Sequence, residues 1–260
     1  MKTEATEQTQ GRKVAIVTAA AGAGIGSAIA QRLAKDGFEV VVTDAHERRC
    51  TEHAERHSVE FGRPFVALEC DVTRSERVRE VVDIVVERFG RIDVLVNNAG
   101  WSKIEPVAEM SVETWQRCLE VDLTGTFYCM RYALPVMIAK RSGVIVNISS
   151  IAAWEMTAEH GAAYSAAKAG VLALTRVAAA ENGRHGIRVN AVAPGLIYNE
   201  FLRKIYPDSF FDGYAHDRSL VGRVGSPDDV AAVVSFLVSD QAGYITGDVY
   251  GVSGGVAPHG

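Results

Sequence analysis

Tyr164 and Lys168 are the two residues of this chain whose types and spacing most clearly suggest chemistry. They stand four residues apart in a stretch with helical periodicity, so the phenol and the ammonium share one side of a helical turn. A free tyrosine has a pKa of ~10, and a fixed cation beside it favours the phenolate. Tyr164 can then act as a general base toward an alcohol or a general acid toward a ketone. Because such a pair is more often a surface pair, the interpretation depends on the neighbouring motifs.

A pair of serines, Ser149 and Ser150, ends an apolar run 14 residues before Tyr164. A serine at the carboxyl end of a buried strand opens toward the crevice in which open α/β sheets bind their ligands. The hydroxyl of Ser150 can hydrogen-bond a substrate oxygen and help to stabilise the charge that develops there.

A glycine-rich segment follows the first apolar run of the chain and contains Gly22, Gly24 and Gly26. A glycine-rich turn between a strand and a helix lets the backbone approach a pyrophosphate, which then sits on the N-terminus of the helix. Ile25 begins an amphipathic stretch, so the glycines lie in the required context. We therefore expect Gly22, Gly24, Ile25 and Gly26 to contact a dinucleotide, with an ordinary tight turn as the alternative.

Asp44 ends the second apolar run, 20 residues after Gly24. A dinucleotide-binding fold places an acid at this point, on the hydroxyls of the adenosine ribose. A carboxylate accepts hydrogen bonds from both hydroxyls and repels a 2′-phosphate, so the sequence favours NAD over NADP. Arg48 and Arg49 lie close by, but on a helix we expect them to form a solvated face. The alternative role of Asp44 is to cap the helix that begins near Ala45.

Two further strand ends carry polar residues that can line the same cleft. Asp71 can accept a hydrogen bond from the adenine amino group, or it can cap the helix that starts near Ser75. Amide side chains after the fourth run can tie neighbouring strands together and line the cofactor cleft, or they can form only a structural turn. The positions expected to contact the cofactor here are Asp71, Val72, Asn98, Ala99 and Gly100.

Short apolar runs alternate with helical patterns along the chain. Several runs are continuous and rich in β-branched residues, as a parallel sheet covered on both faces requires. Ile25, Ile29 and Leu33 form one amphipathic stripe, and a second runs from Val78 to Phe89. This alternation predicts an α/β fold with a Rossmann-like, doubly wound, seven-stranded parallel sheet and helices on both faces. The expected strands are Val14–Thr18, Val40–Asp44, Phe65–Cys70, Val94–Asn97, Val144–Ser149, Arg188–Ala193 and Asp248–Val252.

The chain shows no linker, repeat or low-complexity stretch, so we expect a single catalytic domain over residues 12–260. Residues 1–11 are polar and are expected to form a flexible N-terminal tail. The segment 195–225 is the only long stretch without a regular pattern, and such segments inside compact domains are usually functional lids. We therefore expect it to cover the substrate.

The composition argues against several classes of protein. The formal net charge is −5 and 48% of the 260 residues are hydrophobic, which supplies a sizeable core but no basic surface for nucleic acid. The four cysteines have no CxxC spacing and no metal-ligand pattern with histidine, so we expect free thiols and no metal. No apolar run reaches the ~18 residues of a membrane helix, and no signal peptide is evident. We therefore expect a cytoplasmic protein.

The motifs follow one another in a highly specific order, and from about residue 12 to 256 the chain resembles the short-chain dehydrogenase/reductase family. The resemblance rests on the glycine-rich turn, Asn97–Gly100, Asn147–Ser150, Tyr164-x-x-x-Lys168, Pro194-Gly195 and Ile245–Gly247. It implies that Ser150 binds the substrate oxygen and that Tyr164 is the acid/base. It also implies that Lys168 lowers the pKa of the tyrosine and binds the nicotinamide ribose.

The same resemblance implies a nicotinamide dinucleotide as cofactor, with NAD expected from Asp44. The positive nicotinamide of NAD⁺ would further favour the tyrosine phenolate. The backbone after Pro194 and Gly195, which includes Ile197, is expected to contact the nicotinamide. Family members are usually tetramers or dimers, so the resemblance also implies a homo-oligomer.

Two departures from the family pattern affect the predicted machinery. The family's glycine turn opens with Thr-Gly and is one residue shorter, so here, with Ala19 and Ala20 in that region, the turn must be rebuilt around Gly22. Asp122 stands where the family has an asparagine of a proton relay. If Asp122 is ionised near Lys168, it should raise the pKa of the Lys–Tyr pair and give alcohol oxidation a more alkaline optimum than in Asp122→Asn.

A third departure follows Pro194 and Gly195, where the family's threonine is replaced by Asn199 or its neighbours. Asn199 can still hydrogen-bond the nicotinamide carboxamide.

The expected substrate contacts are Trp101 and Trp154, which flank two strand ends, and Phe201 and Leu202 in the aromatic-rich lid. Such side chains can line a roomy apolar pocket for a bulky secondary alcohol or ketone, or they can simply pack the lid down. The lid's basic residues Arg203, Lys204 and Arg218 can meet a phosphate, for instance of a CoA thioester, although a solvated face is the more common role.

Several functions within and outside catalysis stay open at this point. Parts of the sequence resemble dehydrogenases of bacterial steroid-ring catabolism, and a 3-oxoacyl thioester reductase or a sugar or polyol dehydrogenase also fits the family. Some family members bind a dinucleotide without turning over a substrate and act as sensors or structural subunits. Asp122 and the altered glycine turn favour that alternative, whereas intact Ser150, Tyr164 and Lys168 disfavour it.

Overall fold

The computed structural model describes residues 11–62, 64–199, 202–203 and 206–259. Within this part of the chain, seven parallel strands form one sheet in the order β3-β2-β1-β4-β5-β6-β7. The strands are β1 (Val14–Val17), β2 (Glu39–Asp44), β3 (Val66–Glu69), β4 (Val94–Asn97), β5 (Gly143–Ile148), β6 (Ile187–Pro194) and β7 (Val249–Val252). The helices are α2 (Ile25–Lys35), α3 (Glu47–Phe61), α4 (Ser75–Phe89), α5 (Val112–Leu119), α6 (Gly125–Lys140), α7 (Ala162–Asn182), α9 (Asp208–Asp217) and α10 (Pro227–Val238).

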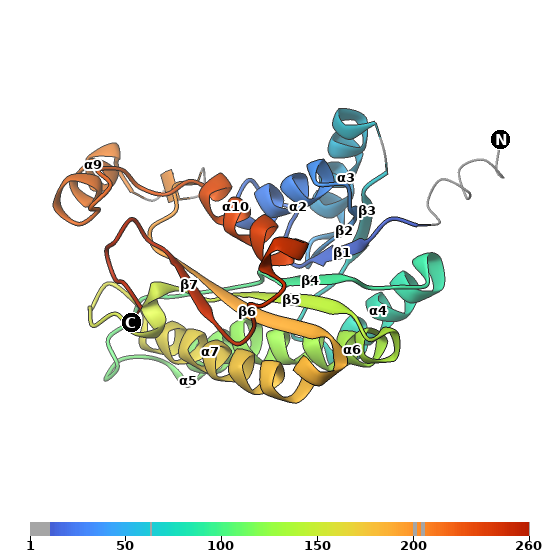
Figure 1. Cartoon of the computed structure of the whole chain (residues 1–260). Coiled ribbons are helices and arrows are strands. Elements are labelled where there is room, and N and C mark those ends of the chain that lie inside the picture. Colours follow the sequence, from blue (N-terminus) through green and yellow to red (C-terminus); the bar gives the residue numbers. More distant parts are fainter. Residues whose placement is uncertain (1–10, 63, 200–201, 204–205, 260) are drawn as a thin grey trace.

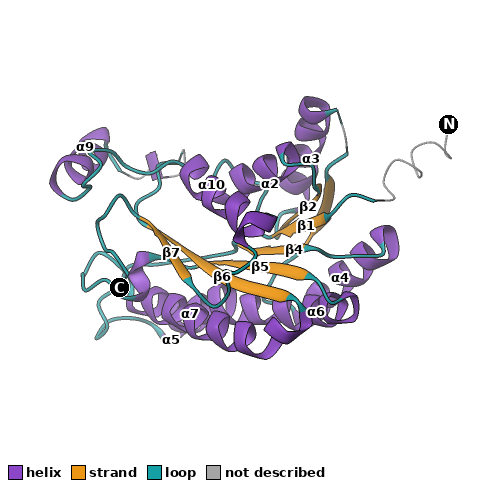
Figure 2. Ribbon diagram, in the orientation of Figure 1, coloured by secondary structure: helices purple, strands orange, loops and turns teal. Residues whose placement is uncertain are grey.

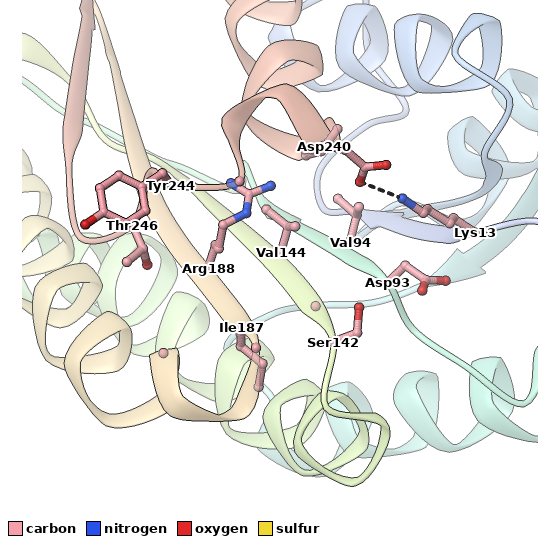
Figure 3. Close-up of a pocket in the computed structure, with 15 residues that line it drawn as sticks. Lys13, Asp93, Val94, Ser142, Val144, Ile187, Arg188, Asp240, Tyr244 and Thr246 are labelled. Atoms are coloured by element: carbon pink, nitrogen blue, oxygen red, sulfur yellow. Dashed lines mark hydrogen bonds and ion pairs between the residues drawn. The ribbon is translucent and has the colours of Figure 1, made fainter.

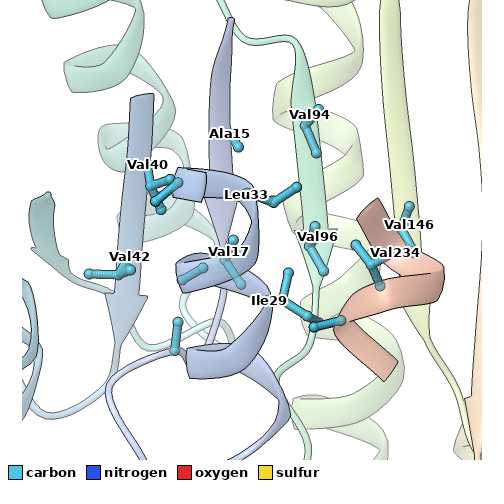
Figure 4. Close-up of a cluster of buried hydrophobic side chains, with 14 of the residues drawn as sticks. Ala15, Val17, Ile29, Leu33, Val40, Val42, Val94, Val96, Val146 and Val234 are labelled. Carbon is cyan, nitrogen blue, oxygen red and sulfur yellow. The ribbon is translucent and has the colours of Figure 1, made fainter. Parts of the chain in front are cut away.

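Helices cover both faces of the sheet, as Figures 1 and 2 show. One layer contains α2, α3 and α10, and the opposite layer contains α4, α6 and α7. Each layer has its own buried cluster of side chains because a parallel strand with both faces covered must be apolar on both sides. Figure 4 shows the first cluster, in which Ile29 and Leu33 of α2 meet Val96 of β4 and Val234 of α10.

The strand order reverses between β1 and β4, which are neighbours in the sheet although two strands separate them in the chain. In an open α/β sheet, ligands bind outside the carboxyl ends of the strands at such a switch point. The topology therefore predicts that a ligand binds at the carboxyl ends of β1 and β4.

The structure confirms the predicted doubly wound sheet, and each observed strand lies within one residue of its predicted bounds at both ends. The prediction of a wholly irregular segment over 195–225 is wrong, because α9 occupies residues 208–217. The short helix was missed because Gly213 and its polar neighbours obscure the helical period. Residues 1–10 of the predicted tail lie outside the described residues.

Candidate active site

A cleft of about 1260 Å³ lies along the carboxyl ends of the strands. Many of the positions predicted from the sequence share this one cleft, although they come from distant parts of the chain. These are Ile25, Asp44, Asp71, Val72, Asn98, Ala99, Gly100, Trp101, Ser150, Tyr164, Lys168, Pro194, Gly195, Ile197 and Leu202. The structure thus brings the predicted catalytic pair and the predicted cofactor positions to one edge of the sheet.

Lys168 projects from α7, an alanine-rich helix whose small buried residues Ala163 and Ala167 let it pack closely against its neighbours. The ammonium is almost completely buried. Its Nζ donates a hydrogen bond to the carbonyl of Ile148 at 3.1 Å and lies 2.9 Å from Oδ1 of Asp122. The contact with Asp122 is an ion pair rather than a well-directed hydrogen bond.

Asp122 is fully buried beneath the cleft in a π-helical turn, Glu120–Thr124, that joins α5 to α6. Its Oδ2 accepts a hydrogen bond from the backbone N–H of Trp101 at 2.8 Å. Short π-helical turns inside longer helices occur frequently at functional sites. Here the turn directs one carboxylate toward both Lys168 and the start of the loop that follows β4.

The surroundings of Tyr164 and Lys168 shift both pKa values upward. Burial raises the pKa of Tyr164 and the Asp122 carboxylate adds to the rise, whereas Lys168 and a hydrogen bond with Ser150 oppose it. Burial alone would lower the pKa of Lys168, but Asp122 and Tyr164 raise it and the net direction is upward. The phenol is therefore the resting form of Tyr164 in the protein without cofactor.

Asparagine side chains fasten the strands beneath the cleft, as the sequence suggested. Nδ2 of Asn97 donates to Oδ1 of Asn147 at 2.8 Å and so links β4 to β5. Nδ2 of Asn98 donates to the carbonyls of Thr18 and Ala19 at 3.0 and 3.1 Å. The hydroxyl of Thr18 in turn accepts from the backbone N–H groups of Asn98 and Ala99 at 2.9 and 3.1 Å. This role of Thr18 was not predicted from the sequence.

The glycine-rich turn places the N-terminus of α2 at the cleft. No side-chain hydrogen bond from the described residues caps this helix, so its first N–H groups are available to an anion such as a pyrophosphate. Gly26 is needed for packing, since an added Cβ would lie 2.5 Å from Nδ2 of Asn98 and 2.6 Å from the carbonyl of Ala19. Gly22 and Gly24 are not among the residues that line the cleft.

The sequence predicted a turn rebuilt around Gly22, but the unusual backbone conformation of this turn is not at Gly22. The left-handed backbone conformation falls on Ala19, with φ +50°, while Gly22 has no positive φ. An added Cβ on Gly22 would meet only the backbone nitrogen of Gly24, at 4.0 Å. The strained residue of the turn is therefore Ala19, which the sequence alone does not reveal.

Asp44 ends β2 at the far end of the cleft. Its Oδ1 accepts hydrogen bonds from the backbone N–H of His46 at 3.0 Å and from the guanidinium of Arg49 at 3.2 Å. Burial raises the pKa of Asp44, and Arg49 partly offsets the rise. The prediction that Arg49 lies on a solvated face is incomplete, because its half-exposed side chain turns back onto Asp44. The residue at the N-cap position of α3 is His46, not Asp44.

Asp71 follows β3 and forms a local turn. Its Oδ1 accepts from the backbone N–H and the hydroxyl of Thr73 at 3.0 and 2.8 Å. The N-cap position of α4 is occupied by Arg74, so Asp71 shapes the approach to the helix rather than capping it. Its position in the cleft remains compatible with a contact to an adenine amino group.

The segment 195–225 closes on itself. The backbone N–H of Tyr198 donates to the carbonyl of Gly225 at 2.7 Å, and that of Gly225 donates to the carbonyl of Leu196 at 3.1 Å. Its aromatic rings pack against one another: Phe211 contacts Tyr198 and Phe210, and Phe210 stacks on Tyr206. Of the two roles left open for these rings, the structure favours packing within the segment. The residues that it contributes to the cleft are Leu196, Ile197, Asn199 and Leu202.

Arg218 connects this segment to the loop between Ser150 and Tyr164. It forms ion pairs with Glu155 and with Glu159, the latter at 2.5 Å. Glu155 also contacts Nε2 of His160 at 3.0 Å. Arg218 is thus engaged within the protein, and the suggestion that it meets a substrate phosphate loses support. Lys204 lies outside the described residues.

Two of the four predicted substrate contacts line the cleft, namely Trp101 and Leu202. Trp154 lies elsewhere: its indole N–H donates to the carbonyl of Ala257 at 3.2 Å, and its ring packs edge-on against His259. The prediction for Trp154 is therefore corrected to a contact with the C-terminal segment. Phe201 lies outside the described residues.

A second hollow, of about 680 Å³, lies at the opposite edge of the sheet, where the strands begin. Figure 3 shows Lys13 and Asp240 pointing toward each other there, at a distance of 3.2 Å. Arg188 lies in the same hollow and donates to the carbonyls of Ser239 and Ile245. These contacts fasten the C-terminal part of the chain to the sheet. The residues that line this hollow do not form a catalytic arrangement.

The described residues contain no group of three or more histidine, cysteine or acidic side chains that could hold a metal ion. All four cysteines, Cys50, Cys70, Cys118 and Cys129, are free and buried. Within the same part of the chain, no helix is both long and apolar enough to cross a membrane.

Comparison with known proteins assigns the fold and the site to a family. A family model described as enoyl-(acyl carrier protein) reductase matches residues 19–257, and the residues that carry the site lie inside this range or next to it. The chain belongs to the short-chain dehydrogenase/reductase family. It is accordingly an oxidoreductase that acts on CH–OH and keto groups of small molecules and uses a nicotinamide dinucleotide.

Individual members of the short-chain dehydrogenase/reductase family match over nearly the whole chain. A (5R,7aS)-5-hydroxy-7a-methyl-1-oxo-2,3,5,6,7,7a-hexahydro-1H-indene-carboxyl-CoA reductase of Mycobacterium tuberculosis is 45% identical over 93% of this chain and 92% of the relative. A 3-oxoacyl-(acyl-carrier-protein) reductase of Staphylococcus epidermidis is 37% identical over 94% and 98%. The crystal structure of gox2181 superposes with a TM-score of 0.89 at 35% identity, over 97% of this chain and 98% of that one.

Two contacts of this short-chain dehydrogenase/reductase site were not predicted from the sequence. The Glu155–Arg218 pair joins residues 63 positions apart, and nothing in the local pattern signals it. The Asp44–Arg49 pair could have been predicted from the sequence, because the first residues of a helix that starts after β2 lie close to the end of that strand.

Proposed function

We propose that this chain is an NAD(H)-dependent oxidoreductase that interconverts a secondary alcohol and a ketone on a bulky apolar substrate. The arrangement of Ser150, Tyr164 and Lys168 around one cleft at the strand ends supports this most strongly. A surface Tyr–Lys pair would have left the lysine in solvent, whereas Lys168 is only 3% exposed.

In the reductive direction, Tyr164 gives its phenolic proton to the oxygen of the substrate carbonyl, and in the oxidative direction it takes that proton back. The Ser150 hydroxyl donates to the same oxygen and stabilises the charge that develops on it. Lys168 supplies the cation that favours the phenolate and is held in place by Ile148 and Asp122. A nicotinamide held beside Tyr164 and Ser150 would supply the hydride for reduction or take it up in oxidation.

The residues along the cleft fit such a cofactor from end to end. The uncapped N-terminus of α2 suits the pyrophosphate, and Asp44 suits the adenosine ribose. Asp71 and Val72 line the same cleft and suit a contact with the adenine. The backbone from Pro194 to Ile197 borders the cleft near Ser150 and Tyr164, as a contact to the nicotinamide requires.

The substrate is proposed to be a cyclic or polycyclic ketone or its alcohol. Trp101 and Leu202 provide apolar walls, and the Mycobacterium tuberculosis relative acts on a fused-ring substrate joined to CoA. A 3-oxoacyl thioester reductase is the second candidate, and the match to the Staphylococcus epidermidis enzyme supports it. A sensor that binds a dinucleotide without turnover is the third, but it gives no reason for the intact Ser150, Tyr164 and Lys168 constellation.

A substrate panel tests the proposal. The purified protein is given NADH with fused-ring ketones, their CoA thioesters and linear 3-oxoacyl thioesters, and the loss of NADH absorbance is followed. Faster turnover of the fused-ring compounds supports the first candidate, and faster turnover of linear thioesters replaces it with the second. NADH binding without any turnover would favour the sensor. We also propose a cytoplasmic homo-oligomer, a dimer or tetramer, which sedimentation analysis can test.

A further inference from the structure

Arginine and lysine side chains line the cleft at three positions in the part of the chain that the structure describes, namely Arg49, Arg117 and Lys168. Two of these cations are paired with a carboxylate: Arg49 lies 3.2 Å from Asp44, and Lys168 lies 2.9 Å from Asp122. The side chain of Arg117 forms no ion pair and no hydrogen bond with any described residue. Its charge is therefore available to a ligand in the cleft.

Arg117 lies on α5 and is held over the ring of Trp101, with its Cζ atom 4.7 Å from the ring centroid. A guanidinium that stacks on an aromatic ring keeps the edge that carries its N–H groups open, and this edge can donate paired hydrogen bonds to an oxyanion. The stack also limits the freedom of the arginine before a ligand arrives, which lowers the entropic cost of binding. Arg117 is thus oriented by an uncharged partner and keeps its hydrogen-bond donors available.

Trp101 is fixed beside the proposed catalytic residues. Its backbone N–H donates to Oδ2 of Asp122 at 2.8 Å, and its carbonyl accepts from the thiol of Cys118 at 3.2 Å. Trp101 and Tyr164 pack against the same small buried cluster, which α5 and α7 form between them. The stack of Arg117 on Trp101 therefore lies on the Tyr164 side of the cleft, where the substrate is proposed to bind.

The acidic neighbours of Arg117 limit where an anion can bind. Glu113 stands four residues before Arg117 and Glu120 three residues after it, and both line the cleft. Residues at these spacings are neighbours on a helix, yet neither carboxylate is paired with Arg117. The two carboxylates repel an anion from other points on this rim, so a ligand oxyanion is favoured only at the guanidinium.

We propose that Arg117 is a specificity-determining residue that binds an oxyanion of the substrate, a carboxylate or a phosphate ester, at the end remote from the reacting carbonyl. The inference rests on the proposed function and narrows the substrate class from bulky ketones in general to those that carry a negative charge. Trp101 packs beside both Arg117 and Tyr164. It can therefore contact the apolar body of the substrate between the charged end and the carbonyl.

The test measures the Kd of ketones by calorimetry in the presence of saturating NAD⁺, because a ketone bound beside the oxidised cofactor cannot be reduced. One pair of ligands is 6-oxodecahydronaphthalene-2-carboxylate and its methyl ester. The other pair is 3-oxobutanoyl-CoA and 3-oxobutanoyl-pantetheine, which lacks the phosphates. The Kd of NADH is measured separately for each protein.

The proteins compared are the unmodified chain, Arg117→Met and Arg131→Met. Methionine keeps the apolar stem that covers Trp101 and removes the charge. Arg131 is a matched control, because it is an exposed arginine of α6 that does not line the cleft and forms no ion pair with a described residue.

We expect the unmodified protein to bind the charged member of at least one pair about tenfold more tightly than the neutral member, the scale of one charge-assisted hydrogen bond. Arg117→Met should remove this preference and change the Kd of the neutral ligands and of NADH by less than about threefold. Arg131→Met should change no Kd by more than that. A loss confined to the keto acid identifies a carboxylate as the group bound, and a loss confined to the CoA thioester identifies a phosphate.

The inference is overturned if the unmodified protein prefers the charged member of neither pair, or if Arg117→Met weakens charged and neutral ligands equally. It is also overturned if Arg117→Met weakens NADH binding by the same factor, which would place the residue on the cofactor, or if Arg131→Met has the same effect. None of these measurements requires hydride transfer. Failure of the protein to oxidise NADH with any of the four compounds would count against the proposed function instead, so the two failures can be told apart.

Discussion

Oδ1 of Asp122 lies 2.9 Å from Nζ of Lys168, and the two side chains are only 0% and 4% exposed. A carboxylate thus neutralises the cation that should stabilise the phenolate of Tyr164. Because screening by water is weak at such depth, the effect of this charge should reach Tyr164 almost undiminished. The ion pair therefore sets the pH range in which the site can act as a base.

Substitution Asp122→Asn should move alcohol oxidation to lower pH. Asp122 raises the pKa of Tyr164, so removal of its charge lowers that pKa and makes the phenolate available in less alkaline solution. We expect the pH–rate profile to shift downward by about one unit, at the low end of the effect of a neighbouring charge. Identical profiles for the two proteins, with Lys168 still required for turnover in both, would contradict this role.

Glu155 should act as a positioning residue for the segment 195–225, which borders the cleft. It contacts Arg218 of that segment and His160 of its own loop, and its side chain is 10% exposed. We expect Glu155→Gln to raise KM for the substrate by about tenfold while kcat changes little, because a charged hydrogen bond of this kind contributes ~1.5–3 kcal/mol.

Glu159 provides the comparison for this prediction, since it pairs with the same arginine but is 64% exposed. Glu159→Gln should change KM by less than about threefold, as expected of a solvent-screened pair. Equal effects of the two substitutions, or a fall in kcat with unchanged KM, would argue against a role in holding the segment over the substrate.

Replacement of Ala19 by glycine should stabilise the folded protein. Its φ of +50° is a conformation that costs an L-residue roughly 1–2 kcal/mol, whereas glycine adopts it freely but loses about 0.5–1 kcal/mol of conformational entropy. We expect Ala19→Gly to raise the free energy of unfolding by about 0.5 kcal/mol. Urea denaturation measures the change, and Ala20→Gly, at a buried residue without a positive φ, should lower it.

His53 should make the stability of the protein depend on pH. Its ring is buried, its Nε2 lies 2.7 Å from the hydroxyl of Ser27, and burial together with His57 and Arg56 lowers its pKa to about 4. The unfolded chain binds this proton near pH 6.5, so the free energy of unfolding should fall as pH decreases from 6.5 to 4. The loss is up to about 3 kcal/mol at the lower end.

Urea denaturation at several pH values measures the slope of the free energy of unfolding against pH. This slope should flatten in His53→Gln, whereas His216→Gln, at an exposed residue, should keep the slope of the unmodified protein. A slope that survives in His53→Gln would assign the proton to another group.

Most of the fold could be predicted because the relevant signals are local. Short, β-branched runs such as Val14–Val17 favour buried strands. The stripe formed by Ile29 and Leu33 predicts both the helix and the face that it buries. The right-handed crossover between parallel strands then leaves few topologies. The glycine turn was placed correctly for the same reason, although its strained residue was not.

The connections between distant segments could not be predicted. That Asp122 lies near Lys168 followed from the family pattern, but the hydrogen bond from Trp101 depends on a π-helical turn that no sequence period reveals. Trp154 could not be assigned to the C-terminal segment, because its partner is 103 residues away. Such contacts depend on how the loops pack against the sheet. The pattern of apolar residues does not predict which loop residues meet.

Turnover by Tyr164→Phe, beside the unmodified protein, is the measurement on which the proposed chemistry depends. With NADH and a ketone that the unmodified protein reduces, we predict a fall in kcat of about a thousandfold, the usual contribution of a general acid, while the Kd of NADH stays the same. Tyr132→Phe, which removes a hydroxyl that contacts Ser75 of α4 and does not line the cleft, should remain active. A Tyr164→Phe protein with kcat within about tenfold of the unmodified enzyme would contradict the assignment of Tyr164 as the proton donor.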